Sequence, residues 1–149
     1  LELKVKGDLR VDIHHTNEDI GIVLGEVFKK ALGDKRGIRR SGDVSWPMEE
    51  VVSTVVVDIS GRGSYKFESR ITGTVPIAEN NYTFEDAKHF FEAFAKHLGM
   101  NLNMTIEPLV SNLHKTLEPA FKALGKALDE ATQIDPRRKG IPSTKGVID

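Results

Sequence analysis

Two stretches of this chain repeat one another at an offset of 100 residues, and this duplication constrains the fold more than any other feature of the sequence. His14 and Glu18 match His114 and Glu118. The matches continue downstream at the same offset, pairing Leu24, Gly25 and Ala31 with Leu124, Gly125 and Ala131. Several matches in register are unlikely to arise by chance, so we expect two copies of one structural unit.

Apolar residues at helical spacing predict three helices. The first begins near the double histidine His14-His15 and ends at Gly33, where glycine commonly closes a helix. The second covers residues 84–98 and is closed by Gly99, and the third covers residues 117–131. Because proline lacks an amide donor, we expect the third helix to begin late enough for Pro119 to lie in its first turn.

Alternating and β-branched runs predict the strands. Residues 1–6 are expected to pair with residues 9–13 through a turn at Gly7 and Asp8. The runs over 50–60 and 64–71 flank a Gly-Arg-Gly turn, and we expect them to pair with each other. Residues 100–106 form a further strand, whereas residues 33–43 are predicted to be a basic connection.

These elements predict an α+β fold, in which duplicated β-β-α halves pack their sheets against helices. We interpret residues 1–149 as a single domain, with one repeat over about 1–50, another over about 51–135, and a basic tail over 136–149. Two copies 100 residues apart need more than 149 residues. We therefore expect the first repeat to be incomplete, either because the chain is a fragment of a longer polypeptide or because it lacks an element that the second repeat retains.

Composition excludes several classes of partner. The chain is 29% charged with a formal net charge of -1, which argues against nucleic acid or an anionic membrane as the main partner. No apolar run approaches the roughly 18 residues of a membrane span. Cysteine is absent, so a metal site must use nitrogen and oxygen ligands. This composition suits a reducing compartment, and we expect a cytoplasmic location.

The repeated histidine and glutamate are candidate metal ligands. Residues four apart share one face of a helix, so His14 with Glu18, and His114 with Glu118, each offer an imidazole and a carboxylate together. The alternative is that each pair only forms a polar helix start, where the dipole favours a glutamate. The repetition in register favours metal binding. Two further candidates are His15, on a different side from His14, and His89; spacing alone does not choose among Mn, Zn and Fe.

A second set of candidates is suited to a phosphate group. Arginine forks, ammonium groups and a hydroxyl bind a phosphate dianion well. The candidates of this kind are Arg39, Arg40, Arg62, Lys122, Ser143 and Lys145. Lys122 shares a helical face with Glu118, which would place a bound anion about one turn from the metal. The alternative for each of them is a solvated basic surface.

These residues lie in stretches that resemble the imidazoleglycerol-phosphate dehydratase family of histidine biosynthesis, over essentially the whole chain. The matching stretches occur in the family's order: "HHTNEDIGIVLGEV", "LGDKRGIRRSGD", "PMEE", "VVVDISGR", "HFFEAFA", "NLHKTLEPAFKALGKAL" and "IPSTKG". The resemblance implies a fold similar to domain 2 of ribosomal protein S5. It also implies a homo-oligomer of trimers assembled into a 24-mer, with two Mn²⁺ ions in each active site and sites shared between subunits.

The resemblance also implies a reaction and roles for the candidate residues. The family is a hydro-lyase that removes water from imidazole glycerol phosphate to give imidazole acetol phosphate. The residues at its metal-ligand positions are His14, His15, Glu18, His89, His114 and Glu118, of which the two glutamates are also counted as catalytic. The residues at its phosphate-binding positions are Arg40, Arg62, Lys122, Ser143 and Lys145. Two metal ions would stabilise charge on the substrate imidazole, while phosphate contacts fix its orientation.

The chain departs from the family pattern at several positions. The second motif reads His114-Lys115 where the family has paired histidines, which removes a nitrogen ligand and adds a cation. A metal-binding histidine that the family carries in a "DHML"-like stretch, well upstream of the double histidine, is absent. Ile13 also stands where a second Asp is usual, and Pro119 follows Glu118. The resemblance also places one of the family's acid-base carboxylates in that upstream segment, so no residue of this chain is assigned as the general base.

Three hypotheses follow from the sequence. The first is a metal-dependent dehydratase, with the activity of this short chain alone left open. The second is a non-catalytic relative that keeps the fold, the assembly and partial metal binding, with Lys115 as an internal cation. The third, metal-dependent hydrolysis, explains the phosphate-binding set and the motif order less well.

Overall fold

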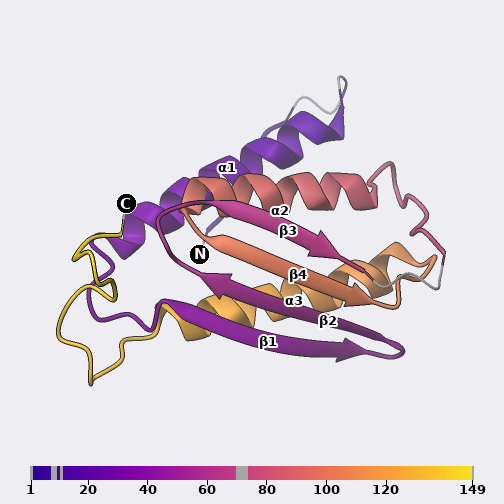
Figure 1. Cartoon of the computed structure of the whole chain (residues 1–149). Coiled ribbons are helices and arrows are strands. Elements are labelled where there is room, and N and C mark those ends of the chain that lie inside the picture. Colours follow the sequence, from indigo (N-terminus) through magenta and orange to yellow (C-terminus); the bar gives the residue numbers. More distant parts are fainter. Residues whose placement is uncertain (1, 8–9, 11, 70–73, 149) are drawn as a thin grey trace.

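A computed structural model describes residues 2–7, 10, 12–69 and 74–148 of the chain, and its elements form a mixed α+β fold (Figure 1). The order along the chain is α1 (Ile13–Leu32), β1 (Ser41–Met48), β2 (Val51–Asp58), β3 (Ser64–Glu68), α2 (Phe84–Leu98), β4 (Asn101–Glu107) and α3 (Leu113–Thr132). The four strands form one sheet in the order β1-β2-β4-β3. The pairs β1–β2 and β2–β4 are antiparallel, and β3–β4 is parallel. The predicted fold class is confirmed.

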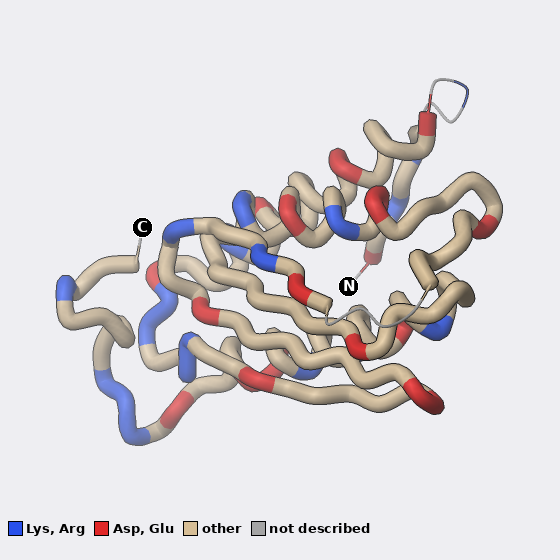
Figure 2. The backbone as a smooth tube through the Cα atoms, turned by 45° about the vertical axis from the view of Figure 1, so that its right-hand side comes forward, with Lys and Arg blue, Asp and Glu red and all other residues tan. Residues whose placement is uncertain are grey.

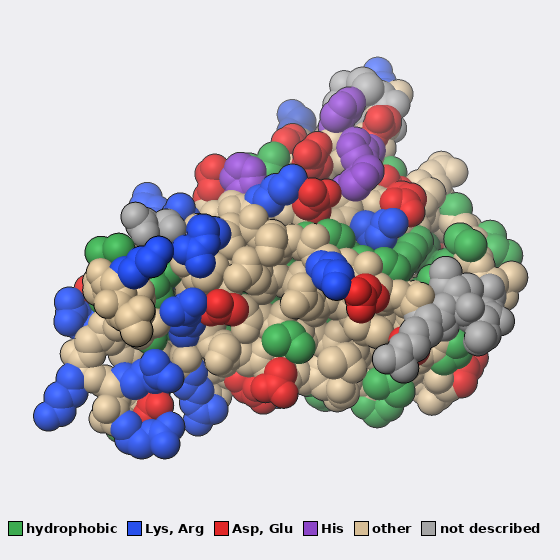
Figure 3. Space-filling model, viewed as in Figure 1, with side chains coloured by type: hydrophobic (Ala, Val, Ile, Leu, Met, Phe, Trp, Pro, Cys, Tyr) green, Lys and Arg blue, Asp and Glu red, His purple; other side chains and the backbone are tan. Residues whose placement is uncertain are grey.

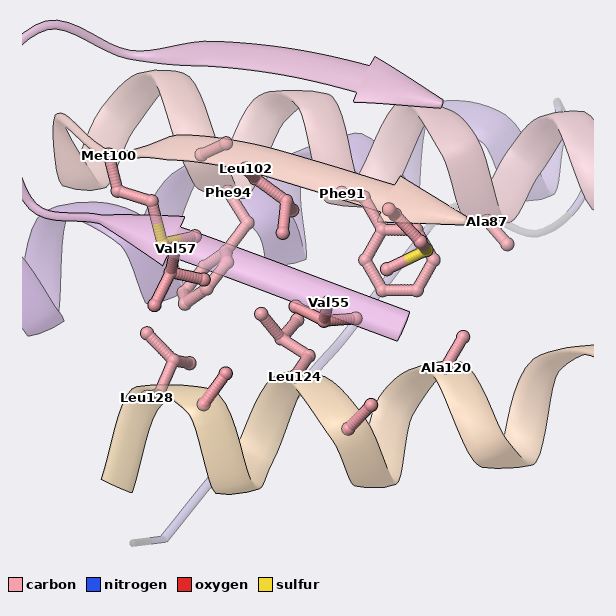
Figure 4. Close-up of a cluster of buried hydrophobic side chains, with 14 of the residues drawn as sticks. Val55, Val57, Ala87, Phe91, Phe94, Met100, Leu102, Ala120, Leu124 and Leu128 are labelled. Carbon is pink, nitrogen blue, oxygen red and sulfur yellow. The ribbon is translucent and has the colours of Figure 1, made fainter. Parts of the chain in front are cut away.

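The core lies between one face of the sheet and the helices α2 and α3 (Figure 4). In β2 the buried and exposed positions alternate, and the register places Val55 opposite Met104 and Val57 opposite Leu102. These four side chains are buried because they point toward the helices, as period two requires. The sheet therefore supplies a rigid platform on which α2 and α3 are fixed.

The helix α1 packs against α2, and two glycines set the closeness of that contact. Gly21 and Gly25 are both buried. A Cβ atom on Gly21 would lie 2.8 Å from the carbonyl oxygen of Phe90, and one on Gly25 would lie 2.8 Å from that of Phe94. Real side chains do not approach a backbone so closely, so only glycine permits this separation of the two helices.

The helix predictions are confirmed for α1 and α2, whereas α3 begins at Leu113 and is longer than the predicted range 117–131. α2 begins after Thr83, which forms a capping box with Asp86, and ends at Gly99 with φ of 80°. α1 begins at Ile13, capped by Asp12, so the double histidine lies in its first turn. α1 and α3 have equal lengths, and their bounds are offset by the repeat distance of 100.

The expected position of Pro119 in a first turn is wrong. α3 begins at Leu113, where the Asn112 side chain accepts a hydrogen bond from the Lys115 amide, and Pro119 lies well inside the helix. Proline removes one amide donor from the helix. Its ring is fully buried, and this packing offsets the lost hydrogen bond.

The strand predictions are wrong for one pairing, for the start of β1 and for the N-terminal hairpin. The predicted pairing of residues 50–60 with 64–71 is wrong, because β2 pairs with β1 and β4, while β3 pairs with β4. The basic connection is shorter than the predicted range 33–43, because β1 begins at Ser41. β1 carries Val44, Trp46 and Met48 at alternate positions, and Pro47 interrupts this period-two pattern; the proline is tolerated because β1 is an edge strand.

The predicted N-terminal hairpin is not formed by its described part. Residues 2–7 form no strand in the structure, and residues 8, 9 and 11 lie outside the described residues. An alternating segment becomes a strand only when a partner completes its hydrogen bonds. No strand within the described part of the chain pairs with residues 2–7.

The C-terminal tail returns along the end of α1 and the loop before β1 (Figure 1). Ile38 forms an isolated bridge with Ile134, and the Gly37 amide donates to the carbonyl of Gly140. Lys35 is buried, and its Nζ donates to the Ile148 carbonyl at 2.7 Å. Among the described residues, no helix has the length and apolarity that crossing a bilayer requires.

Gly25 and Gly125 occupy equivalent positions of the repeat but differ in surroundings, which gives a matched pair of variants. A Cβ on Gly125 would meet nothing within 4 Å. We expect Gly25→Ala to lower the free energy of unfolding by about 1–3 kcal/mol through overpacking. Gly125→Ala should raise it by about 0.5–1 kcal/mol through helix propensity. Urea denaturation measures both, and equal shifts of the same sign would contradict this account of the α1–α2 contact.

Candidate functional site

The first cluster of candidate ligands lies where α1 meets α2, and we call it the α1–α2 site: His14, Glu18, Asp86 and His89. The Nδ1 atoms of His14 and His89 are 3.0 Å apart. His14 Nε2 lies 3.9 Å from the Glu18 carboxylate, and His14 Nδ1 lies 3.7 Å from that of Asp86. Histidine side chains gather over these two helices in Figure 3. Two imidazoles and two carboxylates therefore converge here from separate elements.

Buried polar contacts fix the geometry of the α1–α2 site. Asn17, one turn after His14, donates from Nδ2 to the Asp86 carbonyl at 2.6 Å. The Tyr82 hydroxyl donates to Asn17 Oδ1 at 3.0 Å. Burial, with a smaller contribution from the charge of Asp86, raises the pKa of Tyr82 to about 12, so the phenol keeps its proton and remains a donor. This chain of contacts holds His14 opposite His89.

His15 lines a different hollow from His14, although the two rings lie edge to face with their centroids 5.9 Å apart. Its side chain is 69% exposed, lies 3.8 Å from Asp12 and lines a hollow formed with residues 3–7. His14 and His89 line a different hollow, together with Glu18, Glu92 and Lys96. The structure therefore does not bring His15 to the same point as His14.

The second cluster lies at the start of α3 and the turn between β1 and β2, and we call it the α3 site: Glu49, His114, Lys115, Glu118 and Lys122. His114 Nε2 lies 2.7 Å from one carboxylate oxygen of Glu118, and Lys122 donates to the other. The hydrogen bond from Lys122, with smaller contributions from the Lys122 and His114 charges, lowers the pKa of Glu118. Lys115 Nζ donates to Glu49 and lowers the pKa of that carboxyl in the same way.

Neither cluster is a complete metal site by itself. The part of the chain that the structure describes has no group of three or more histidine, aspartate or glutamate side chains arranged to hold one ion. His14 and His114, which the repeat relates, lie in separate clusters. Ile13 and His114 line one shallow hollow, so the starts of α1 and α3 face the same region of the surface. Each cluster offers part of a coordination shell.

The cationic candidates fall into two places. A hollow beside the tail is lined by Arg40, Ser60, Arg62, Arg138, Ser143 and Lys145, among other residues. Figure 2 shows several lysine and arginine positions along the backbone near the C-terminus. Arg39 and Lys122 are not among the described residues that line it, and Lys122 is bound to Glu118 instead. Within the described ranges, Arg62 and Lys145 form no ion pair, so both are available to an anion.

Arg40 has a different role from the other cations of this hollow. Its Nε and Nη2 atoms donate to the two carboxylate oxygens of Asp58 at 2.6 and 3.0 Å. Its Nη1 donates to the Pro142 carbonyl at 2.8 Å. The hydrogen bond and the charge of Asp58 raise the pKa of Arg40, partly offset by burial. Arg40 therefore ties the tail to the end of β2 and shapes the hollow in which Ser143 lies.

Sequence reasoning missed Asp86, Glu49 and Asp58. Asp86 carries a usable signal, because the Thr83 capping box and the spacing of three to His89 place it on the histidine face of α2. Glu49 and Asp58 reach their partners only through sheet pairing and the packing of α3 on the sheet. No local pattern indicates those contacts.

Comparisons with known proteins identify one family. The family model described as imidazoleglycerol-phosphate dehydratase matches residues 1–128. The Pelobacter propionicus protein of that name is 48% identical over 149 residues, covering 99% of this chain and 74% of that protein. The Haloquadratum walsbyi protein of that name is 46% identical over 148 residues, covering 99% and 69%.

Solved structures agree with the sequence comparisons. The imidazoleglycerol-phosphate dehydratase of Staphylococcus aureus has a TM-score of 0.77 and 30% identity, covering 89% of this chain and 72% of that one. The Pyrococcus furiosus enzyme has a TM-score of 0.74 and 33% identity, covering 95% and 73%. Sequence and fold therefore point to the same family.

Replacing Arg40 tests how the tail is held. In Arg40→Met the contacts to Asp58 and Pro142 are lost, and hydrogen bonds to charged groups contribute about 1.5–3 kcal/mol each. We expect amide hydrogen exchange over residues 141–146 to become at least about tenfold faster, because 1.4 kcal/mol is a factor of ten. The neighbouring variant Arg39→Met should leave this exchange unchanged. Equal exchange in both variants would contradict the role given to Arg40.

Proposed function

The chain belongs to the imidazoleglycerol-phosphate dehydratase family, a family of hydro-lyases, and on this premise we propose that it removes water from imidazole glycerol phosphate in histidine biosynthesis. The product would be imidazole acetol phosphate. The observation that carries the proposal is the match of the family model to residues 1–128, a range that contains both histidine clusters. The proposal is supported by the presence of both kinds of group that this substrate would need, imidazoles and carboxylates in the two clusters and cations in a separate hollow.

The phosphate end of the substrate would bind in the hollow beside the tail. Arg62 and Lys145, which form no ion pair within the described part of the chain, offer positive charge there, and Ser143 offers a hydroxyl. Charge-assisted hydrogen bonds of this kind are the strong ones for a phosphate dianion. Arg40 supports the hollow through its contacts with Asp58 and Pro142. Lys122, by contrast, would need to leave Glu118 before it could contact a phosphate.

The imidazole end would bind at the histidine clusters, where we propose Mn²⁺ as the cofactor. The residues that would hold it are His14, His15, Glu18, His89, His114 and Glu118. Imidazole and carboxylate ligands without thiolate suit such an ion. When bound, a divalent cation would stabilise negative charge on the substrate ring. Of these residues, His14, Glu18 and His89 lie together at the α1–α2 site, where no ammonium group within the described residues forms an ion pair with Glu18 or Asp86.

Side chains of this chain would also hold or accept protons. Without an ion, the Nδ1 atoms of His14 and His89 lie within hydrogen-bond distance, so one ring donates a proton to the other, and an ion bound between them would replace that proton. Glu118 is held ionised by Lys122, so its carboxylate acts as a ligand or a base rather than as an acid. Glu18 is half exposed and can reach a molecule bound beside His14.

We further propose that the sites are completed by other copies of the chain. Each described cluster offers only part of a coordination shell, so a neighbouring subunit is needed to supply the rest. A trimer that assembles further into a 24-mer would place such partial sites against one another. We also propose that this biosynthetic enzyme works in the cytoplasm.

Turnover of imidazole glycerol phosphate tests the proposed function directly. Purified protein incubated with substrate and Mn²⁺ should form imidazole acetol phosphate, detected by the ultraviolet absorbance of the base-treated product. A chelator should abolish the signal, and added Mn²⁺ should restore it. Folded protein with bound Mn²⁺ and no turnover would contradict the proposal.

Arg62→Met tests the phosphate-binding hollow. A lost charge-assisted contact of about 1.5–3 kcal/mol should raise KM about 10–100-fold while changing kcat little. Lys139→Met, at an exposed tail residue that does not line the hollow, should leave KM unchanged. Imidazole glycerol without the phosphate should be turned over equally by Arg62→Met and the unmodified protein. A KM effect of equal size in Lys139→Met would point to general electrostatics instead.

A further inference from the structure

The repeat places a lysine where its first copy has a histidine. His15 and Lys115 occupy the same position in the first turn of α1 and α3. The backbone amide of His15 donates to Asp12 Oδ1 at 3.2 Å, and that of Lys115 donates to Asn112 Oδ1 at 2.9 Å. Because the two helix starts are capped in the same way, both side chains leave the helix at equivalent positions. The second copy thus presents an ammonium group where the first presents an imidazole.

The ammonium of Lys115 is held by carboxylates of the turn between β1 and β2. Its Nζ donates to Glu49 and lies 3.8 Å from the Glu50 carboxylate. The Lys115 side chain is 31% exposed, compared with 69% for His15. Glu49 has a φ of 50°, so this turn adopts a backbone conformation that side chains rarely take. The contact fixes both Lys115 and the turn.

The other carboxylate of the α3 site is also engaged. One oxygen of Glu118 contacts His114 and the other accepts from Lys122. A divalent cation at this site would have to displace an ammonium group from Glu118 and would lie near the second one on Lys115. The α1–α2 site differs, because its carboxylates Glu18 and Asp86 contact only His14 among charged partners within the described residues.

We propose that the ammonium of Lys115 takes the place of one divalent cation, so that each chain binds a single metal ion, at the α1–α2 site. This inference rests on the proposed metal-dependent dehydratase and specifies how its metal is arranged. The α3 site then carries a built-in positive charge that neutralises Glu49 and holds the turn next to His114. One divalent cation at the α1–α2 site and the ammonium group of Lys115 would together take the place of two metal ions.

Metal content measures this directly. Protein dialysed to equilibrium against excess Mn²⁺ and analysed by mass spectrometry of the metal should contain about one ion per chain. Lys115→His should raise this to about two, because it removes a cation and adds a nitrogen ligand beside His114. The matched control is Lys126→His, on the same helix at a residue that pairs with Asp129, and it should stay at one. The helical circular dichroism of each variant shows that it has folded.

Each outcome decides between the alternatives. None or two ions in the unmodified protein would overturn the inference, whether or not Lys115→His folds. One ion in both the unmodified protein and folded Lys115→His would overturn it as well. Turnover is measured separately on the same samples. Two bound ions with turnover would overturn only the inference, whereas one bound ion without turnover would count against the proposed dehydratase and leave the metal content as expected.

Discussion

The contact between α1 and α2 is the constraint on which the rest of the site depends. Gly21 and Gly25 let the two helices approach until backbone carbonyls of α2 lie against α1. That approach brings His14 to His89 and lets Asn17 bind the Asp86 carbonyl. Because α2 is in turn packed on the sheet, the position of His14 is set by the core through two layers. A histidine on a loosely attached helix would not hold this geometry.

The first turns of α1 and α3 are equivalent in backbone structure but are surrounded by different charges. Both copies carry a histidine with a glutamate four residues later. Around the first copy, Glu18 and Asp86 contact His14 and form no ion pair with an ammonium group within the described residues, and Lys96, which lines the same hollow, is paired with Glu92. Around the second copy, Lys115 and Lys122 are bound to Glu49 and Glu118 themselves. A cation is stabilised by the first arrangement and opposed by the second. The two helices therefore have matching bounds and caps but differ in the charges around their first turns.

Much of the helical structure was predictable from sequence, because helix ends are set locally. Gly99 and the Thr83 capping box define α2 within a few residues. Strand pairing was not predictable, because β2 and β4 meet through residues far apart in the chain. In β1, Pro47 interrupts the alternation of Val44, Trp46 and Met48 that would indicate a strand. In the candidate site, too, the local features were predictable and the contacts between distant elements were not. The pairing of histidine and glutamate is local, whereas the partners of Arg40, Lys115 and His14 are supplied by other elements.

The central claim is that α1 and α2 together hold a divalent cation through His14 and His89. Crystals of the protein grown with Mn²⁺, measured by anomalous diffraction at the manganese edge, test it most directly. The account predicts an anomalous peak within bonding distance of both imidazoles. A peak elsewhere in the assembly, with His14 and His89 both facing solvent and unbound, would contradict it.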